Sequence, residues 1–205
     1  DCVLTTRELA RMIKQANIEF EQLEEKEFDS PMGEATGAAA IFGVTGGVME
    51  AALRSVSEIL TGEELEKIEF KEIRGEQGIK RASLKLGEID IKVVVAHGLG
   101  NAQTIMEEIK SGKADYQFVE IMACPGGCIM GGGQPIKNSK IRGTIDVRRK
   151  RAEAMYSIDE KSKIRKSHEN PILKQIYSEY IGVPGGHKAH ELLHTTYSRK
   201  EKYNI

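Results

Sequence analysis

Apolar residues recur at the spacing of an α-helix in three parts of the chain. The first follows Thr5, whose side chain forms a capping box with Glu8 and predicts a helix to about residue 16. A second helix is expected between the glycine-rich turn 43–47 and Gly62, and a third over residues 102–109. The apolar faces of these three helices consist of Leu9, Met12, Ile13 and Ala16, then Met49, Leu53, Val56 and Leu60, and then Ala102, Ile105, Met106 and Ile109.

Runs rich in β-branched and alternating apolar residues predict strands in the middle of the chain. Residues 79–86 and 89–96 flank a Gly-Glu turn and predict a hairpin. Residues 116–122 follow the third helix and predict a strand parallel to the hairpin, joined to it by a right-handed crossover. Residues 3–4 and 66–73 predict two further strand segments. The order of elements indicates an α/β fold, with a mixed or parallel twisted sheet flanked by helices.

The pattern changes character beyond Pro135. From Arg142 onward the chain is highly charged and helical, with breaks predicted at Asn170-Pro171 and at residues 184–186. Residues 19–37 are acidic and polar, and we expect them to be irregular. We therefore divide the chain into an α/β lobe, residues 1–141, and a helical C-terminal segment, residues 142–205, that packs on it.

The composition excludes several functional classes. The formal net charge is −1 and aromatic residues make up 5%, so the chain has no net positive field for nucleic acid and few aromatic groups for base stacking. No apolar run reaches the ~18 residues of a membrane span, and we expect no membrane insertion. Three cysteines are too few for a disulfide scaffold and indicate a reducing compartment, so we expect a cytoplasmic protein. The chain begins at Asp1, which suggests a processed or excised piece.

The strongest chemical signal is the sequence MACPGGC, residues 122–128, which is followed by GGGQP at residues 131–135. Cys124 comes directly after a predicted parallel strand, at the edge where α/β sheets bind ligands. Pro125 and two glycines allow a tight loop that directs two thiolates at one iron–sulfur centre or zinc ion. Two thiolates hold neither on their own, so further ligands must come from elsewhere. The alternative interpretation is two buried cysteines beside a turn.

Three weaker motifs have simpler interpretations. The sequence HELLH, residues 190–194, matches the zinc-protease pattern and has His187 on the same face. We favour a charged terminal helix that packs its two leucines inward. The sequence GLG at residues 98–100 is half of a dinucleotide fingerprint, and we interpret it as a strand–helix turn. The turn 43–47 lacks the lysine of a phosphate loop, although the helix N-terminus there would suit an anionic cofactor.

Six blocks of the chain together resemble the catalytic domain of the iron-only hydrogenases. They follow the order and spacing of that family over nearly the whole chain, and the block around the cysteine pair is the most specific. The blocks are residues 5–10, 28–33, 37–39, 42–54, 122–135 and 187–195.

The resemblance implies a cofactor and a role for particular residues. Cys124 would bind a 4Fe–4S cubane, and Cys128 would bridge it to a di-iron subsite that carries CO, cyanide and a dithiolate. The cubane and the di-iron subsite together form the H-cluster. Met122, Phe42 and Val48 match family residues that line the di-iron pocket. The implied activity is the reversible oxidation of H2 and reduction of protons. The terminal helices match a part that some members carry as a small subunit.

The two other cysteine motifs of the family, which lie upstream of this segment, are absent. The chain is therefore expected to be one lobe of a two-lobed domain and inactive alone. It should expose an apolar face around Phe42, Val48, Met122 and Pro125. The expected partners are the N-terminal remainder of the catalytic domain, and ferredoxin or another redox protein or subunit. The alternatives are an iron–sulfur assembly or sensory relative, and a stand-alone dithiol or metal-binding domain.

Overall fold

A mixed three-stranded sheet is the centre of the fold. The computed structural model describes residues 2–26, 35–65, 69–75 and 77–198. Strands β1 (Ile79–Leu86) and β2 (Ile89–His97) form an antiparallel hairpin, and β3 (Phe118–Met122) lies parallel to β2. The predicted hairpin, the parallel strand and the α/β class are confirmed.

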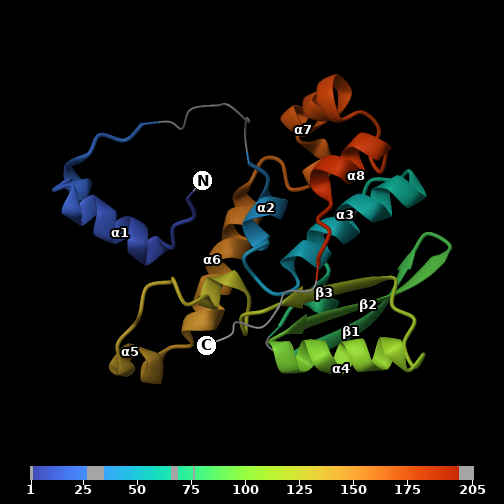
Figure 1. Ribbon diagram of the computed structural model, residues 1–205, viewed down its shortest axis with the longest axis horizontal. Coiled ribbons are helices and arrows are strands. Elements are labelled where there is room, and N and C mark those ends of the chain that lie inside the picture. The colour runs from blue at the N-terminus through green and yellow to red at the C-terminus, as the bar shows by residue number, and fades with distance from the viewer. Residues whose placement is uncertain (1, 27–34, 66–68, 76, 199–205) are drawn as a thin grey trace.

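Helices and short turns make up the other described elements (Figure 1). The α-helices are α1 (Thr6–Gln15), α2 (Gly37–Ile41), α3 (Gly47–Thr61), α4 (Leu99–Lys110), α5 (Ser139–Thr144), α6 (Val147–Lys161), α7 (Pro171–Ile176) and α8 (His187–Leu193). The short turns of 3-10 helix are η1 (Phe20–Gln22), η2 (Lys71–Ile73), η3 (Cys128–Met130) and η4 (Ser167–Glu169), and η5 (Tyr177–Ile181) is a π-helical turn.

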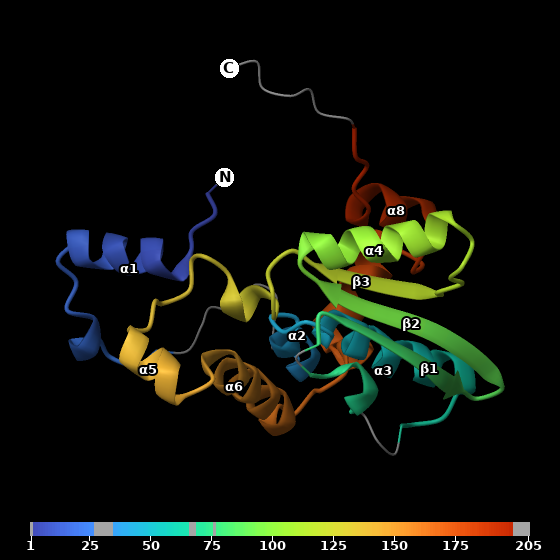
Figure 2. The same ribbon diagram turned by 90° about the horizontal axis from the view of Figure 1, so that it is seen from below.

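Two helices cover the two faces of the sheet (Figure 2). Met49 and Leu53 of α3 pack on one face, and Ile105 of α4 packs on the other. Successive side chains of β2 point to opposite faces, so residues 93–96 are all buried. The predicted α3 and α4 are confirmed, including the left-handed Gly62 that ends α3.

The buried faces of α3 and α4 are narrower than the pattern predicts. Val56 and Leu60 of α3 are 41% and 49% exposed, and Met106 and Ile109 of α4 are 45% and 39% exposed. A small sheet covers only a narrow stripe of each helix, so apolar residues at the edge of that stripe keep contact with water.

The C-terminal segment packs on the rest of the chain through α6, which lies against α2 (Figure 1). The sequence did not predict α2, because its run of glycine and alanine has no amphipathic pattern. These small residues allow close approach, since a Cβ on Gly37 would lie 2.4 Å from Oδ1 of Asp159. The predicted breaks are confirmed: Asn170 caps α7, and α8 begins after Gly186.

Helix α1 lies apart from this body (Figure 1). Its capping box is confirmed, with the N–H of Thr5 donating to Glu8 at 2.8 Å and the N–H of Glu8 donating to Thr5 Oγ1 at 3.3 Å. No residue of α1 is buried. Arg7 attaches the helix to the glycine-rich segment after the cysteines by donating to the carbonyls of Gly132 and Gly133.

Two predicted strand segments are wrong in their described parts. Residues 3–4 form no strand, and Val3 is 97% exposed. Residues 71–73 form the turn η2, which places the single apolar side chain of Ile73 in the core. Residues 66–68 and the family block 28–33 lie outside the described residues. No helix among the described residues combines the length and apolarity that a bilayer span requires.

Candidate functional site

Cys124 and Cys128 lie on a loop that begins where β3 ends. The loop reverses direction at Gly126 and Gly127, whose φ values of +88° and +94° are readily adopted only by glycine. The N–H of Gly127 donates to the carbonyl of Cys124 at 2.9 Å and closes the turn. Cys124 is half-buried and Cys128 is exposed, whereas both glycines and Ile129 are buried. The loop therefore has a packed back and an accessible thiol side.

The α2–α3 turn supports the back of this loop. Gly43 accepts a hydrogen bond from the N–H of Ile129 at 3.1 Å, and the N–H of Thr45 donates to Gly126 at 3.3 Å. A Cβ on Gly127 would lie 2.7 Å from both the Gly43 carbonyl oxygen and the Thr45 nitrogen. Backbone atoms cannot move away from such a contact as the end of a flexible side chain could. The glycine is therefore required here for packing as well as for its backbone angles.

Helix α6 supports the same loop from the C-terminal segment. The guanidinium of Arg151 donates to the carbonyls of Ile129 and Pro135, both at 2.7 Å. The side chain of Arg148 packs on Gly126, where a Cβ would lie 2.5 Å from its Cδ. The cysteine loop is thus fixed by two elements that are distant from it in sequence.

The predicted pocket residues stand at the ends of three elements around this loop. Phe42 follows α2, Val48 lies in the first turn of α3, and Met122 is the last residue of β3. Phe42 is 43% exposed and Pro125 is exposed, while Val48 and Met122 are half-buried. These side chains retain apolar surface on the part of the molecule that carries the thiols.

Glu120 is a site residue that the sequence reasoning missed. It lies on β3 and is buried, with its two carboxylate oxygens accepting from the N–H groups of Gly46 at 2.6 Å and Met49 at 2.7 Å. Burial raises the pKa of this carboxyl, and the two hydrogen bonds oppose that rise. The N-terminus of α3 is therefore capped from inside the chain, and these N–H groups are not available to an anionic cofactor. The feature of the sequence that could have identified Glu120 is an acidic residue within an otherwise apolar strand.

Lys80 adds a second buried charge near the same turn. Its side chain donates to the carbonyl of Ile73, and a Cβ on Gly46 would lie 3.4 Å from its Nζ. Burial lowers the pKa of Lys80 to about 8, and the charge of Glu120 partly offsets this effect.

A network of buried charges joins α3 to the C-terminal segment. The guanidinium of Arg54 bonds Asp159 of α6 through both Nη atoms and bonds Glu50, all at 2.8 Å. Arg165 donates to Asp159 at 2.7 Å, and Arg74 to Glu50 at 2.6 Å. We call these five residues the Arg54 network. The side chains of Arg54, Glu50 and Asp159 are at most 1% exposed, so separating them would leave charges buried without partners.

The glycines of the GGGQP sequence have different explanations. A Cβ on Gly133 would lie 2.3 Å from the Cβ of Thr5, so the start of α1 requires a glycine there. No atom lies within 4 Å of the Cβ position of Gly132. Of these two, only Gly132 fits the idea of room left for a bulky group.

The HELLH motif supplies the last four residues of α8 and its C-cap, His194, but does not pack as predicted. Leu192 and Leu193 are 48% and 56% exposed, and Ala189 is the residue that α8 buries. The short helix presents one narrow face to the body, and the leucines lie off it. Nδ1 of His190 and Nδ1 of His194 lie 3.1 Å apart. Gly98 of the GLG sequence connects β2 to α4, which begins at Leu99, so the predicted strand–helix turn is confirmed.

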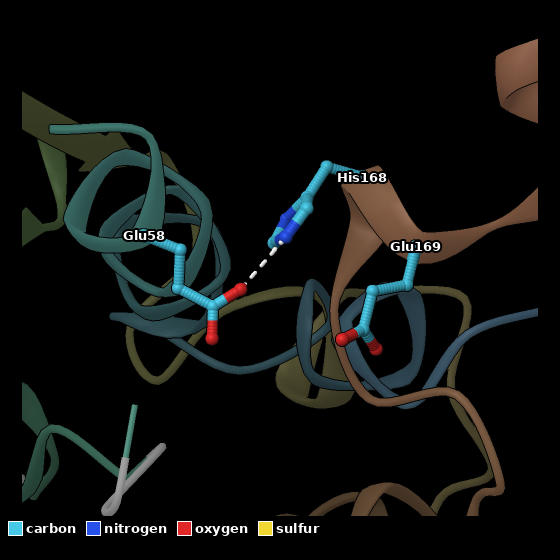
Figure 3. Close-up of side chains that lie close together, drawn as sticks. All are labelled: Glu58, His168 and Glu169. Carbon is cyan, nitrogen blue, oxygen red and sulfur yellow. Dashed lines mark hydrogen bonds and ion pairs between the residues drawn. The ribbon is translucent and has the colours of Figure 1, made fainter. Parts of the chain in front are cut away.

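A separate cluster brings metal-ligand side chains together (Figure 3). Glu58, His168 and Glu169 place ligand atoms within 4.8 Å of one another. His168 Nε2 lies 2.8 Å from Glu58 Oε2. However, the Lys166 ammonium lies 2.7 Å from Glu58 and 3.1 Å from Glu169 and supplies the positive charge itself. We interpret this cluster as an ion-pair contact between α3 and η4.

Comparison with known families assigns both parts of the chain. Residues 1–132 match the family described as iron only hydrogenase large subunit, C-terminal domain. The chain belongs to the iron-only hydrogenases. Residues 145–200 match the family described as iron hydrogenase small subunit. The boundary predicted at residue 141 falls between these matches and stays a prediction.

Individual hydrogenases are similar along most of the chain. The NADP-reducing hydrogenase subunit HndD of Solidesulfovibrio fructosivorans is 46% identical over 98% of this chain and 34% of its own length. Iron hydrogenase 1 of Clostridium pasteurianum is 48% identical over 97% of this chain and 35% of its own length. The chain thus spans about a third of these curated relatives.

A solved structure and a more distant group of relatives complete the comparison. The FeFe-hydrogenase HydA1 from Chlamydomonas reinhardtii superposes with a TM-score of 0.73 at 42% identity, covering 96% of this chain and 55% of that one. The cytosolic Fe–S cluster assembly factor narfl of Xenopus tropicalis is 28% identical over the whole chain and 42% of its own length.

Proposed function

We propose that this chain is the C-terminal lobe of an iron-only hydrogenase that reversibly oxidises H2 and reduces protons. It acts only with the N-terminal remainder of the catalytic domain. The observation that carries the proposal is the cysteine loop, whose back is fixed by α6 and the α2–α3 turn while Cys124 and Cys128 keep an accessible side. Thiolates held in this way suit an iron–sulfur centre that also binds a second protein part.

The donor set of this loop fits half of an H-cluster. A 4Fe–4S cubane takes four cysteines, so Cys124 and Cys128 would supply two and the remainder of the catalytic domain the others. Cys128, the more exposed thiol, would also bind the di-iron subsite with its CO, cyanide and dithiolate. When bound, the H-cluster supplies the iron at which H2 is split or formed and the cubane that exchanges electrons.

The residues around the loop would shape the pocket. Phe42, Val48 and Met122 would form an apolar wall that keeps bulk water from the bound group and limits access to small molecules. Glu120 would hold the first turn of α3, which carries Val48, against β3, which carries Met122. The chain's own residues thus position and shield, and the proposed chemistry belongs to the cofactor.

The exposed apolar surface supports the proposed partners. Leu9 and Met12 of α1 are 49% and 50% exposed, and Phe42 is exposed beside the cysteine loop. We propose that the N-terminal remainder covers these exposed apolar side chains, because exposed apolar surface often marks an interface. Ferredoxin or another redox subunit would then exchange electrons with the complete protein.

The similarity values and the pocket favour turnover over an assembly role. Hydrogenase relatives are 46–48% identical to this chain, against 28% for the assembly factor. The apolar residues Met122 and Phe42 are retained at the positions that the resemblance assigns to the di-iron pocket. Neither observation favours a stand-alone dithiol domain.

Replacing the proposed bridging ligand tests the function in the complete enzyme. Cys128→Ser should abolish H2 evolution, because a hydroxyl binds soft iron centres far more weakly than a thiolate. Cys2→Ser is the matched control, since Cys2 is exposed and precedes α1. H2 evolution, iron content and the infrared bands of CO and cyanide are measured for both. Near-normal activity of Cys128→Ser, or loss of activity in Cys2→Ser, would refute the assignment.

Met122→Leu separates the pocket wall from protein stability. The exchange keeps volume and apolarity, so the free energy of unfolding should change by less than ~1.5 kcal/mol. H2 evolution should fall while the variant stays folded, because the side chain facing the di-iron site has changed shape. Unchanged activity would remove Met122 from the proposed wall.

A further inference from the structure

His190 and His194 bring two imidazole nitrogens together at the end of α8. Their Nδ1 atoms lie 3.1 Å apart, their ring centroids are separated by 4.3 Å, and the ring planes meet at 81°. Both residues are exposed. Two ring nitrogens at this distance either share one proton or bind one cation, because two lone pairs facing each other would repel.

The separation of the nitrogens matches a pair of adjacent ligands on one metal ion. Imidazole nitrogen binds Zn²⁺ at about 2.0–2.1 Å. Two such bonds to atoms 3.1 Å apart meet at the ion at roughly 100°. This value lies between the right angle of square or octahedral complexes and the tetrahedral angle, so the spacing of the nitrogens suits either geometry once the two rings turn their lone pairs toward one ion.

The helix that carries this pair is anchored to the rest of the chain before any ion binds. The two histidines are four residues apart: His190 lies within α8, and His194 is the residue that caps it, one turn further on, with its N–H donating to the carbonyl of His190 at 3.1 Å. Ala189 anchors the helix in the body with 4% exposure. Lys188 ties it to η5, donating to the Tyr180 carbonyl at 2.5 Å with its ammonium 3.6 Å from the centre of that ring.

We propose that His190 and His194 form a two-ligand site for a late first-row divalent metal ion such as Zn²⁺, Ni²⁺ or Cu²⁺. Imidazole suits these ions, whereas Mg²⁺ and Ca²⁺ prefer oxygen ligands. Water completes the coordination, since no third histidine, cysteine or carboxylate joins this pair among the described residues. The site is therefore open, unlike a closed structural zinc centre.

The decisive experiment is a Zn²⁺ titration by calorimetry on the 205-residue chain. The three cysteines are first changed to serine, so that thiolates do not bind the added metal. In this background, His190→Gln and His194→Gln should each weaken Zn²⁺ binding by about tenfold or more, because even the loss of outer-shell contacts costs 10–100-fold. His187→Gln, on the same helix, is the matched control and should change the affinity less than twofold. Mg²⁺ should not compete.

The result has two opposite outcomes. Weakening in both variants, with the control unchanged and the circular dichroism of all proteins alike, establishes the site. Affinity that both variants leave unchanged, or that falls equally in His187→Gln, overturns it and leaves a shared proton as the explanation of the contact. Copper spectra give a second readout, since two coupled nitrogens in the electron paramagnetic resonance signal should become one in either variant.

Discussion

Lys80 shows how burial changes the chemistry of one side chain. The residue is 5% exposed in an amphipathic strand, and its side chain reaches the carbonyl of Ile73 at the loop beyond the sheet. Its pKa falls from the ordinary 10.5 to about 8 because burial disfavours the ammonium. A residue that is charged in nearly all proteins at pH 9 is therefore mostly neutral here.

The lowered pKa predicts a specific pH dependence of stability. Between pH 8 and 10.5 the unfolded chain keeps the Lys80 proton that the folded chain has lost, so the free energy of unfolding rises with pH. Over the whole window this contribution is on the order of 3 kcal/mol. Lys80→Met, which has no proton to lose, should lack it. Urea unfolding at pH 7.5 and 10 gives the free energy of unfolding of both proteins. The prediction is contradicted if the wild-type value minus the Lys80→Met value does not rise between the two pH values.

Gly127 is the residue on which the cysteine loop depends most directly. Gly127→Ala should destabilise the protein by at least roughly 1–3 kcal/mol, because its φ of +94° is strained for alanine and the new Cβ meets two backbone atoms. In the complete enzyme the same variant should bind less iron.

Gly132→Ala is the matched control in the same glycine-rich region. Nothing lies within 4 Å of its Cβ position, so its unfolding free energy should change by no more than about 0.5 kcal/mol. If both variants melt together at the wild-type temperature, the close packing of Gly127 is not required.

Between elements, the Arg54 network carries the contact of α3 with α6. Arg54→Leu should cost about 3 kcal/mol, since Glu50 and Asp159 lose the cation that lies between them. The value lies at the low end of the range for buried pairs because Arg74 and Arg165 still bind the two carboxylates. Chemical denaturation measures the loss.

A surface pair on α6 provides the control for that experiment. Arg149 and Glu153 lie 3.7 Å apart and are 64% and 51% exposed, so Arg149→Ala should cost less than about 0.5 kcal/mol. If Arg54→Leu and Arg149→Ala lower the free energy of unfolding equally, the Arg54 network stabilises the protein no more than this surface pair does.

Elements with a strong local pattern could be predicted, and those set by distant contacts could not. The hairpin follows from alternation around Gly87, and α3 follows from its glycine boundaries. By contrast, residues 71–73 were expected in the strand 66–73, yet they form the turn η2, in which Ile73 reaches the core and Phe70 packs beside it. Helix α2 was not predicted, because its small residues are needed only for the close approach of α6, which lies far along the chain.

The same distinction applies to the candidate site. The cysteine pair was visible because its spacing and its glycines are local. Glu120 and Arg54 were not, because an isolated charge in an apolar segment does not identify its partner. Glu120 bonds Met49, 71 residues away, and Arg54 bonds Asp159, 105 residues away, which only the folded chain reveals.

For the molecule as a whole, we predict that the purified chain lacks the di-iron cofactor and does not evolve H2. In the proposed assignment it would supply two of the four cubane thiolates, and its thiol side is open to water and oxygen. Iron and acid-labile sulfide analysis, together with infrared spectra in the CO and cyanide region, test this. A chain that shows those bands and evolves H2 would mean that one lobe is sufficient.

The Arg54 network should hold the two parts of the protein together even if the backbone between them is cut. It joins α3, within the first family match, to α6, within the second, while the stretch between the matches carries exposed residues such as Ile136. The two parts could therefore be encoded as separate polypeptides that still associate. Either piece alone would leave buried charges without partners and would be unstable. Limited proteolysis should give two fragments that elute together from a sizing column and separate only in denaturant.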